Sequence, residues 1–386
     1  MATSRGSIVI DARVNALPGA HGIARSVMKL TAHLGQADGL GLRVLVNSAR
    51  TQLFPLSEIP AHADVIDTGV RLGAAHRCGE LARLIRSVGA TVLYVPYPTS
   101  TPLIRPCPVV VTVHDCTIES SAAFAGGWHR QAWLALAFRA VLRRAAAVTA
   151  PTMASLADIR RHYPYAQRLT LVPNGVDATR FGAVTEADVA AARARYQLPE
   201  QFILTVGAHR PHKNHQTLVR ALAALPEAVP LVIVGQPDPT FPARLPRLIR
   251  ELGLDSRVIV VPDVADNWLP AVYRAASVFA FPSLAEGFGL PVLEAMAAGV
   301  PVVASDIPAL AEVAGPAALP VAPLDVEGWT SALAKVLGDQ GTSQALAQAG
   351  ADVAAGATWE RGAGVLLDVL SAVARQSLPA SPRDPC

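Results

Sequence analysis

Residues 278–306 read VFAFPSLAEGFGLPVLEAMAAGVPVVASD, and this stretch decides the fold. VFAFPS is a short apolar run typical of a buried strand, a glycine-rich loop follows it, PVLEAMAAG is helical, and VPVVASD starts another buried strand. Pro291 stands where proline is favoured, at the first turn of the helix. The backbone amides of Phe288, Gly289 and Leu290 then point outward from the helix start, which predicts a site for an anion such as a diphosphate.

Two carboxylates flank this anion site: Glu286 in the loop and Glu294 in the first turn of the helix. A phosphate needs neither of them, whereas ionised carboxylates accept charge-assisted hydrogen bonds from the hydroxyls of sugars and riboses. One loop could therefore hold phosphate, ribose and hexose together. In the alternative interpretation, Glu294 is only a favourable charge at a helix N-terminus and Glu286 is a solvated loop residue. Spacing alone leaves both interpretations open.

Similar short apolar runs recur along the whole chain, separated by helical patterns. The first half contains SIVIDARV, LRVLVNS, TVLYVPY, PVVVTVHD, AAVTAPT and LTLVPNG, and the second half contains QFILTVGA, VPLVIVG, RVIVVPDV, SVFAFPS and VPVVASD. Strands that alternate with helices predict two doubly wound parallel sheets, because parallel strands need crossover helices. Residues 177–199 lack strand patterns and predict the boundary, and the ligand cleft is expected between the halves, beyond the carboxyl ends of strands.

Composition limits the class of protein. Of the 386 residues 51% are hydrophobic and 16% are charged, which favours a globular chain with buried sheets. The uncharged stretch 87–104 contains three prolines, so it does not predict a transmembrane helix, and the N-terminus has no long apolar segment of a secretion signal. Four cysteines without CxxC spacing favour reduced thiols and a cytoplasmic location.

Charge is unevenly shared along the chain. Residues 1–180 carry 19 Lys and Arg against 10 Asp and Glu, whereas the remainder carries 14 against 20. The basic half is the side expected to face an anionic partner, such as a lipid diphosphate or the inner face of a membrane, so a peripheral membrane contact is part of the prediction. An arginine-rich genome composition would explain the same bias. Nothing in the sequence indicates a nucleic-acid partner.

The motif EGFGLPVLE, with Glu286 and Glu294 eight positions apart, resembles the E-x7-E motif of the family-4 retaining glycosyltransferases. The resemblance extends to VPNGVD at 172–177, to the VG…KN segment around Lys213, to LPAVYRAASVFAFPS and GVPVVASDIPALAEVAG on either side of the motif, and to the N-terminal PGAHGIARSVMKL. It therefore covers nearly the whole chain, and it implies a GT-B fold: two Rossmann-like domains that face a central cleft.

The expected domains follow from this resemblance and from the patterns. The N-terminal, acceptor-side domain spans 1–180, and the C-terminal domain, which binds the nucleotide-sugar, spans 181–356. An amphipathic helix at about 357–376 is expected to pack back onto the first domain. The Pro/Ser-rich tail at 377–386 is expected to be disordered.

The family pattern carries over residue by residue. It implies that Glu286 contacts the hydroxyls of the donor sugar and Glu294 the ribose, with the amides of Phe288, Gly289 and Leu290 near sugar and phosphate. Lys213 matches the lysine that neutralises the departing diphosphate. Val264 completes the donor-binding set in the second half of the chain.

The arginine that usually accompanies this lysine is missing. Its two usual positions hold Ala208 and His212, so either Arg210, nearby in the loop, or His212 could replace it.

In the first half, His114 follows a buried strand, and the resemblance places it beside the donor sugar. A lone histidine after a strand is otherwise more often structural. The loop PGAHGIARS resembles the glycine-rich loop near the donor diphosphate, where Gly19 and Gly22 would let the backbone approach a phosphate, although His21 stands where a second glycine is common. Residues 128–144, WHRQAWLALAFRAVLRR, are helical: they either cover the sheet with a solvated basic edge or dock on a membrane.

No GxGxxG after a strand, no GxxxxGK[ST] and no GxSxG occurs, which argues against a dehydrogenase, a P-loop NTPase and a serine hydrolase. No DxD-like pair or His/Cys cluster indicates a metal, so transfer without a metal or other cofactor is expected. The predicted reaction moves a hexosyl group with retention, and the best guess is mannose from GDP-mannose to a cell-surface glycan or glycolipid. A sugar-nucleotide-binding protein without catalysis, or another GT-B enzyme such as an epimerase, is the alternative.

Overall fold

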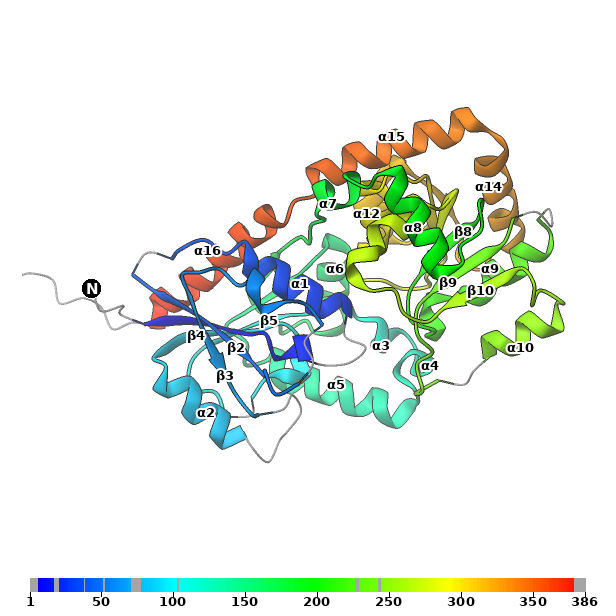
Figure 1. Cartoon of the computed structure of the whole chain (residues 1–386). Helices are drawn as coiled ribbons and strands as arrows, with labels where there is room; N and C mark the ends of the chain where they lie inside the picture. Colours follow the sequence, from blue (N-terminus) through cyan, green and yellow to red (C-terminus); the bar gives the residue numbers. More distant parts are fainter. Residues whose placement is uncertain are drawn as a thin grey trace, which may run out of the picture. The chain divides into compact units, whose positions relative to one another are not determined.

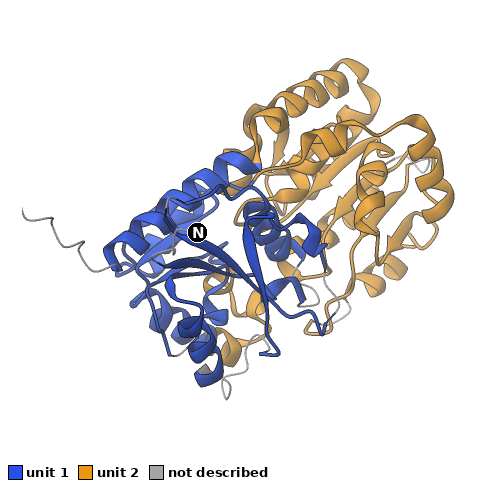
Figure 2. Ribbon diagram, turned by 60° about the vertical axis from the view of Figure 1, so that its left-hand side comes forward, with its two compact units in different colours: residues 1–116, 132–174, 359–386 blue, residues 117–131, 175–358 orange. Residues whose placement is uncertain are grey.

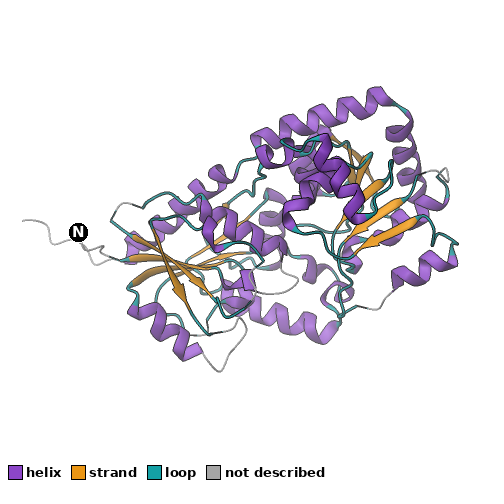
Figure 3. Cartoon of the chain, in the orientation of Figure 1, coloured by secondary structure: helices purple, strands orange, loops and turns teal. Residues whose placement is uncertain are grey.

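The structure is a computed structural model that describes residues 6–16, 21–37, 39–50, 53–70, 78–102, 104–225, 229–241 and 244–377. The chain forms two compact units (Figure 2). Unit 1 contains Met1–Cys116, Ala132–Asn174 and Trp359–Cys386, and unit 2 contains Thr117–Gln131 and Gly175–Thr358. Each unit is a parallel sheet with helices, as the alternation of strands and helices predicts (Figure 3).

The sheet of unit 1 has seven strands in the order β3-β2-β1-β4-β5-β6-β7, and all of its pairings are parallel. The strands are β1 (Ser7–Asp11), β2 (Gly41–Val46), β3 (Ala63–Asp67), β4 (Ala90–Val95), β5 (Val109–Thr112), β6 (Ala147–Ala150) and β7 (Leu169–Leu171). The central strands β1, β4, β5 and β6 are almost wholly buried, which explains their continuous apolar sequences.

Longer helices lie between these strands along the chain, and one more comes from the end of the chain (Figure 1). They are α1 (His21–Ala32), α2 (Cys78–Ser87), α5 (Trp128–Leu142), α6 (Met153–His162) and, from the end of the chain, α16 (Trp359–Ser377). Helix α16 packs against α1, β1 and β4. Its Gly362 lies so close to the Pro173 carbonyl that a Cβ atom there would be 2.1 Å from the oxygen. This close approach requires glycine.

The sheet of unit 2 has six parallel strands in the order β10-β9-β8-β11-β12-β13. The strands are β8 (Ile203–Val206), β9 (Leu231–Val234), β10 (Val258–Val261), β11 (Val278–Phe281), β12 (Val302–Ser305) and β13 (Ala318–Val321). The α-helices are α3 (Thr117–Ser120), α4 (Ala122–Ala125), α7 (Ala178–Gly182), α8 (Glu186–Tyr196), α9 (His215–Ala223), α10 (Arg244–Glu251), α11 (Leu269–Arg274), α12 (Leu290–Ala297), α13 (Pro308–Ala314), α14 (Val326–Gly338) and α15 (Gln340–Gly356).

Apolar side chains cover both faces of this sheet. On the central strand β11, Phe279 and Phe281 enter one buried cluster, whereas Val278 and Ala280 enter another on the opposite face. This alternation follows from the two-residue period of a strand. Both faces of β11 are therefore fixed, and so is the point at which the strand ends and the glycine-rich loop begins.

The predicted fold class is confirmed, and every apolar run quoted above contains a strand. Two strands, β3 and β13, had not been predicted. The contact-based units differ from the predicted limits 1–180 and 181–356, because the boundary falls after Asn174 and residues 117–131 group with unit 2. Ser377 is the last residue of α16, and the rest of the predicted disordered tail, 378–386, lies outside the described residues.

Within the described residues, no helix combines the length and the apolar character needed to cross a bilayer.

Candidate functional site

The loop after β11 turns sharply into α12. Gly289 is the N-cap residue of the helix, with φ 94° and ψ 49°, and a Cβ atom there would lie 2.5 Å from Leu310 Cδ2. Glycine is thus required both by the backbone conformation and by the space available. Pro291 occupies the start of the helix, as expected. No hydrogen bond from the described residues engages the amides of Phe288, Gly289 or Leu290. The helix start therefore presents free donors to a ligand.

Glu294 does not lie in the first turn of α12, contrary to the sequence-based prediction. The helix begins at Leu290, directly after the left-handed Gly289 and one residue earlier than the predicted PVLEAMAAG, so Glu294 is the fifth helical residue. It is only 5% exposed, and its Oε2 accepts a hydrogen bond of 2.8 Å from the hydroxyl of Tyr273, which is itself buried. A solvated N-terminal charge does not describe this residue. The Tyr273 hydroxyl instead fixes the orientation of a buried carboxylate.

Lys213 and Glu286 form an ion pair. Lys213 ends a short 3-10 turn, Pro211–Lys213, and its Nζ lies 2.6 Å from Glu286 Oε1. The two side chains are 17% and 12% exposed, and Nζ also lies 5.1 Å from the centre of the Phe281 ring. The stem of Lys213 runs along Gly207, where a Cβ atom would lie 3.4 Å from Lys213 Cδ. The ammonium group is thereby held against Glu286, in the loop that leads into α12.

Two more contacts join this turn to the loop after β11. The buried Asn214 donates from Nδ2 to the carbonyl of Pro282 at 3.0 Å, and the amide of Leu284 donates to the carbonyl of His212 at 2.7 Å. Three consecutive residues of the turn thus contact the loop after β11: His212 contacts Leu284, Lys213 contacts Glu286 and Asn214 contacts Pro282. Asn214 adopts a left-handed backbone with φ 53°, a conformation that asparagine tolerates better than most residues. The KN pair is therefore a structural unit: Asn214 anchors the turn and Lys213 presents the charge.

The other basic residues of this loop have partners of their own. The Nε atom of Arg210 donates to Asp238 Oδ2 at 2.8 Å, and the Arg210 side chain is 41% exposed. The ring of His212 packs edge-on against Phe124, with centroids 5.9 Å apart. Arg210 thus pairs with Asp238 and is largely exposed, whereas His212 packs against Phe124.

Two further histidines lie beside this turn. The rings of His209 and His215 meet at 5.5 Å, and burial lowers the pKa of both. For His215, burial and the neighbouring His209 and Lys213 lower the pKa to about 3. Both imidazoles are neutral at pH 7, so Lys213 carries the positive charge at this point. Val264, after β10, packs partly buried against the unit 2 core.

In unit 1, His114 follows β5 at the carboxyl edge of the sheet. Its carbonyl accepts a hydrogen bond of 3.2 Å from Ser155 Oγ, and its Nε2 is buried without a partner among the described residues. Burial lowers the pKa of His114, and the charge of Asp115 and a hydrogen bond with the Pro96 backbone oppose this effect. The side chain is therefore a neutral imidazole at pH 7, with one nitrogen available to a ligand.

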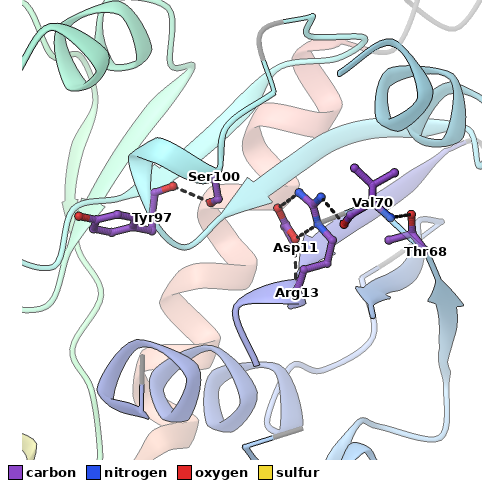
Figure 4. Close-up of polar contacts among 6 residues, drawn as sticks. All are labelled: Asp11, Arg13, Thr68, Val70, Tyr97 and Ser100. Atoms are coloured by element: carbon purple, nitrogen blue, oxygen red, sulfur yellow. Dashed lines mark hydrogen bonds and ion pairs between the residues drawn. The ribbon is translucent and has the colours of Figure 1, made fainter. Parts of the chain in front are cut away.

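Of the predicted glycine-rich loop, Gly22 lies in the first turn of α1, whereas Gly19 belongs to residues 17–20, outside the described part of the chain. The turn before this loop contains a buried ion pair that the sequence analysis missed (Figure 4). Arg13 donates from Nε and Nη2 to both oxygens of Asp11, at 2.7 and 2.6 Å, and from Nη1 to the Val70 carbonyl at 3.2 Å. Both side chains are 2% exposed, so the pair is buried in the turn after β1 and each charge is matched by the other.

Tyr273, Asn214 and Asp238 were not among the residues predicted from the sequence, although the KN pattern contained a signal for Asn214. In the described parts of the chain, no cluster of three or more His, Cys, Asp or Glu side chains is arranged to hold a metal ion.

Two family models match the chain, one in each half. The family model described as "Glycosyl transferases group 1" matches residues 190–353, and the model described as "Glycosyltransferase Family 4" matches residues 20–180. This chain belongs to the glycosyltransferase families that these two models describe. The two matches together include both the EGFGLPVLE loop and His114.

Individual relatives match this chain over only part of its length. The D-inositol 3-phosphate glycosyltransferase of Nocardia farcinica is 36% identical over 217 residues, which are 53% of this chain and 48% of the relative. The O-antigen chain mannosyltransferase RfbU of Salmonella typhimurium is 36% identical over 138 residues, which are 36% of this chain and 38% of that protein. Each of these two matches spans about half the length of the relative or less.

The structure of the HepE protein of Anabaena, solved in complex with UDP and glucose, resembles the glycosyltransferase with a TM-score of 0.77 and 19% identity. The likeness covers 95% of this chain and 99% of HepE. At this identity it establishes a common fold.

Proposed function

We propose that this protein is a retaining glycosyltransferase that moves a hexosyl group from a nucleotide-sugar to a hydroxyl of a cell-surface glycan or glycolipid. The observation that carries the proposal is the ion pair of Lys213 and Glu286, at 2.6 Å, with Glu286 in the same loop whose free amides start α12. An ammonium group and helix amides suit a diphosphate, and a half-free carboxylate beside them suits sugar hydroxyls.

Each residue of the loop has a proposed task. The amides of Phe288, Gly289 and Leu290 bind the diphosphate together with Lys213, whose ammonium has three donors and can keep Glu286 while it contacts a phosphate. The second oxygen of Glu286 accepts from the sugar. Glu294, oriented by Tyr273, accepts from the ribose hydroxyls through the capacity that remains to its carboxylate.

The chemistry rests on stabilising the leaving group. Charge accumulates on the nucleoside diphosphate as the glycosidic bond breaks, and fixed donors that need no reorganisation stabilise it. The acceptor oxygen bonds to the anomeric carbon on the face from which the diphosphate departs, and its proton passes to the departing phosphate oxygen, so the anomeric configuration is retained. His114, with its buried Nε2, is proposed to contact the donor sugar. Lys213 and the helix amides would take the place of a cation, and transfer would need no metal.

We propose GDP-mannose as the first donor to test, because RfbU, which matches 36% of this chain, is a mannosyltransferase. UDP-sugars come next, because HepE was solved with UDP. The acceptor class rests on the O-antigen chain that RfbU is named for.

The first experiment is thermal unfolding against GDP, UDP, dTDP and their sugar conjugates. A ligand at about a hundredfold above its dissociation constant adds about 2.7 kcal/mol to the free energy of unfolding, which raises the melting temperature by a few degrees. Turnover is then measured as nucleoside diphosphate release with the donor that binds, and the anomeric configuration of the product by NMR.

Three single variants test the proposed site. Glu286→Ala should keep diphosphate binding but lose turnover, whereas a sugar-nucleotide-binding protein without catalysis would show no turnover to lose. Arg210→Gln and His212→Gln, compared side by side, identify the second basic group: the one that weakens diphosphate binding replaces the missing arginine. If no nucleoside diphosphate stabilises the protein, the donor site is wrongly assigned.

A further inference from the structure

Helix α5 presents an unusual outer face. Its buried residues Leu134, Phe138 and Leu142 follow one another at four-residue intervals and face unit 1. On the other side, Trp133 is 62% exposed and Leu136 is 66% exposed. Trp128, in the first turn, is 65% exposed, so two of the five tryptophans of the chain lie open to solvent on one helix. A helix that merely covers a sheet has polar residues at these positions.

The same helix is strongly basic. Residues 128–144 contain Arg130, Arg139, Arg143 and Arg144 and no acidic residue. Arg139 and Arg143 are exposed, and they lie three and seven positions after Leu136, on the same side of the helix.

Unit 1 adds another cation at the end of this helix. Arg105, in the loop before β5, donates from Nη2 to the Val141 carbonyl of α5 at 3.3 Å. Its Nε and Nη1 have no hydrogen-bond partner among the described residues, and burial together with the charge of Arg144 lowers the pKa of Arg105 to about 10. Arg105 is still a cation at pH 7. The adjacent Ile104 is 47% exposed, so apolar and cationic side chains alternate here too.

We propose that the outer face of α5, defined by Trp133, Leu136, Arg139 and Arg143, docks on the surface of an anionic lipid bilayer. The helix would lie in the plane of the interface, with Trp133 and Leu136 inserted among the acyl chains near the headgroups and the arginines on the lipid phosphates.

The composition of the face favours a bilayer over other anionic partners. A nucleic acid or an acidic protein would account for the arginines, whereas a bilayer would also bury the tryptophan and the leucine, which are more than 60% exposed. Arginines near a helix C-terminus also stabilise the helix dipole. That effect, together with the contact of the Arg143 guanidinium with the Tyr165 ring at 4.8 Å, explains the position of Arg143 and leaves Trp133 and Leu136 unexplained. Only a membrane surface offers phosphates and hydrocarbon in adjacent layers.

The basic end of this face lies away from the proposed chemistry of unit 1. Arg105 precedes β5 and Arg144 precedes β6, so both lie at the amino edge of a sheet whose strands are parallel. His114 follows β5, at the carboxyl edge. Substitutions on the outer face of α5 should therefore leave donor binding unchanged.

The test is flotation of the purified full chain with vesicles of phosphatidylcholine alone and vesicles that contain 30% phosphatidylglycerol. The native protein should float only with the anionic vesicles, and less as salt rises. Arg139→Gln/Arg143→Gln should lower the partition coefficient about 25-fold, because each of the two cations near the surface contributes about fivefold. Trp133→Ser/Leu136→Ser should abolish flotation and the blue shift of tryptophan emission on anionic vesicles.

Matched controls come from exposed residues of unit 2. Leu324, 71% exposed, and Arg220 give Leu324→Ser and Arg220→Gln, which should bind vesicles like the native chain. Unchanged melting temperature and unchanged stabilisation by the nucleoside diphosphate show that each variant is folded. Three results would overturn the proposal: no flotation of the native chain, equal losses in the controls, or a loss in the arginine variant without one in the Trp133/Leu136 variant. The last result would indicate a general polyanion surface.

Discussion

Replacing Lys213 by methionine removes the ammonium group and keeps most of the length of the side chain. In the native chain this group lies 2.6 Å from Glu286, and both side chains are less than one-fifth exposed. Loss of one partner leaves a poorly solvated carboxylate. Because the pair is intermediate between a surface and a buried ion pair, unfolding should become easier by about 1–3 kcal/mol. Loss of a charged hydrogen bond to the diphosphate costs a further 1.5–3 kcal/mol in binding, or about ten- to hundredfold in Kd.

Calorimetric titration with the preferred nucleoside diphosphate separates the two roles of Lys213. Glu286→Gln also breaks the charge pair but keeps the ammonium, so it should bind the diphosphate as well as the native protein or more tightly. The double variant Lys213→Met/Glu286→Gln should regain stability, because no unpaired carboxylate remains, without regaining affinity. If Lys213→Met binds the diphosphate with native affinity, Lys213 serves only to hold Glu286, and the proposed donor geometry is wrong.

Three other substitutions test particular features, each by urea unfolding. Gly289→Ala places a Cβ atom 2.5 Å from Leu310 Cδ2 at φ 94° and should destabilise the chain by about 1–3 kcal/mol; a neutral result would contradict the described turn. His215→Gln should make the free energy of unfolding fall less steeply between pH 6.5 and 4.5. In the native protein the imidazole, with its pKa near 3, stays neutral while the unfolded chain takes up a proton, and this difference costs about 1.4 kcal/mol of stability per pH unit. Equal slopes for the native chain and the variant would show that burial does not depress this pKa. Arg13→Met should cost about 3–5 kcal/mol by leaving Asp11 buried and unpaired, and a smaller loss than Arg220→Gln would refute that pairing.

The sequence predicted the interior of both sheets and missed one edge strand in each. The central strands are apolar runs because helices or sheet neighbours cover them on all sides. The strand β3 forms one end of its sheet, is half-exposed and contains two aspartates, and β13 forms an end of the other sheet and contains Pro320. Edge strands tolerate charge and proline because one side needs no partner. Their sequences consequently lack the pattern that identifies a buried strand.

Local chemistry in the donor loop could also be read from the sequence, because it lies within a few consecutive residues. The glycine-rich turn, Pro291 and the available amides followed from EGFGLPVLE alone. The partners of these residues come from distant segments: Tyr273 for Glu294, and Asp238 for Arg210. A pattern within one segment cannot reveal such pairings. The helix start could not be placed to the residue either, since it depends on the left-handed conformation of Gly289.

The grouping of residues 117–131 with unit 2 bears on how such a protein could be recombined. Four passages of the backbone, not two, join the units, and Phe124, from the first third of the chain, packs on His212 beside the lysine of the donor loop. A chimera that joined the first 174 residues to the donor half of a relative would bring this phenylalanine against a foreign surface. Exchange of donor specificity by grafting would succeed only if 117–131 travelled with the half that it serves.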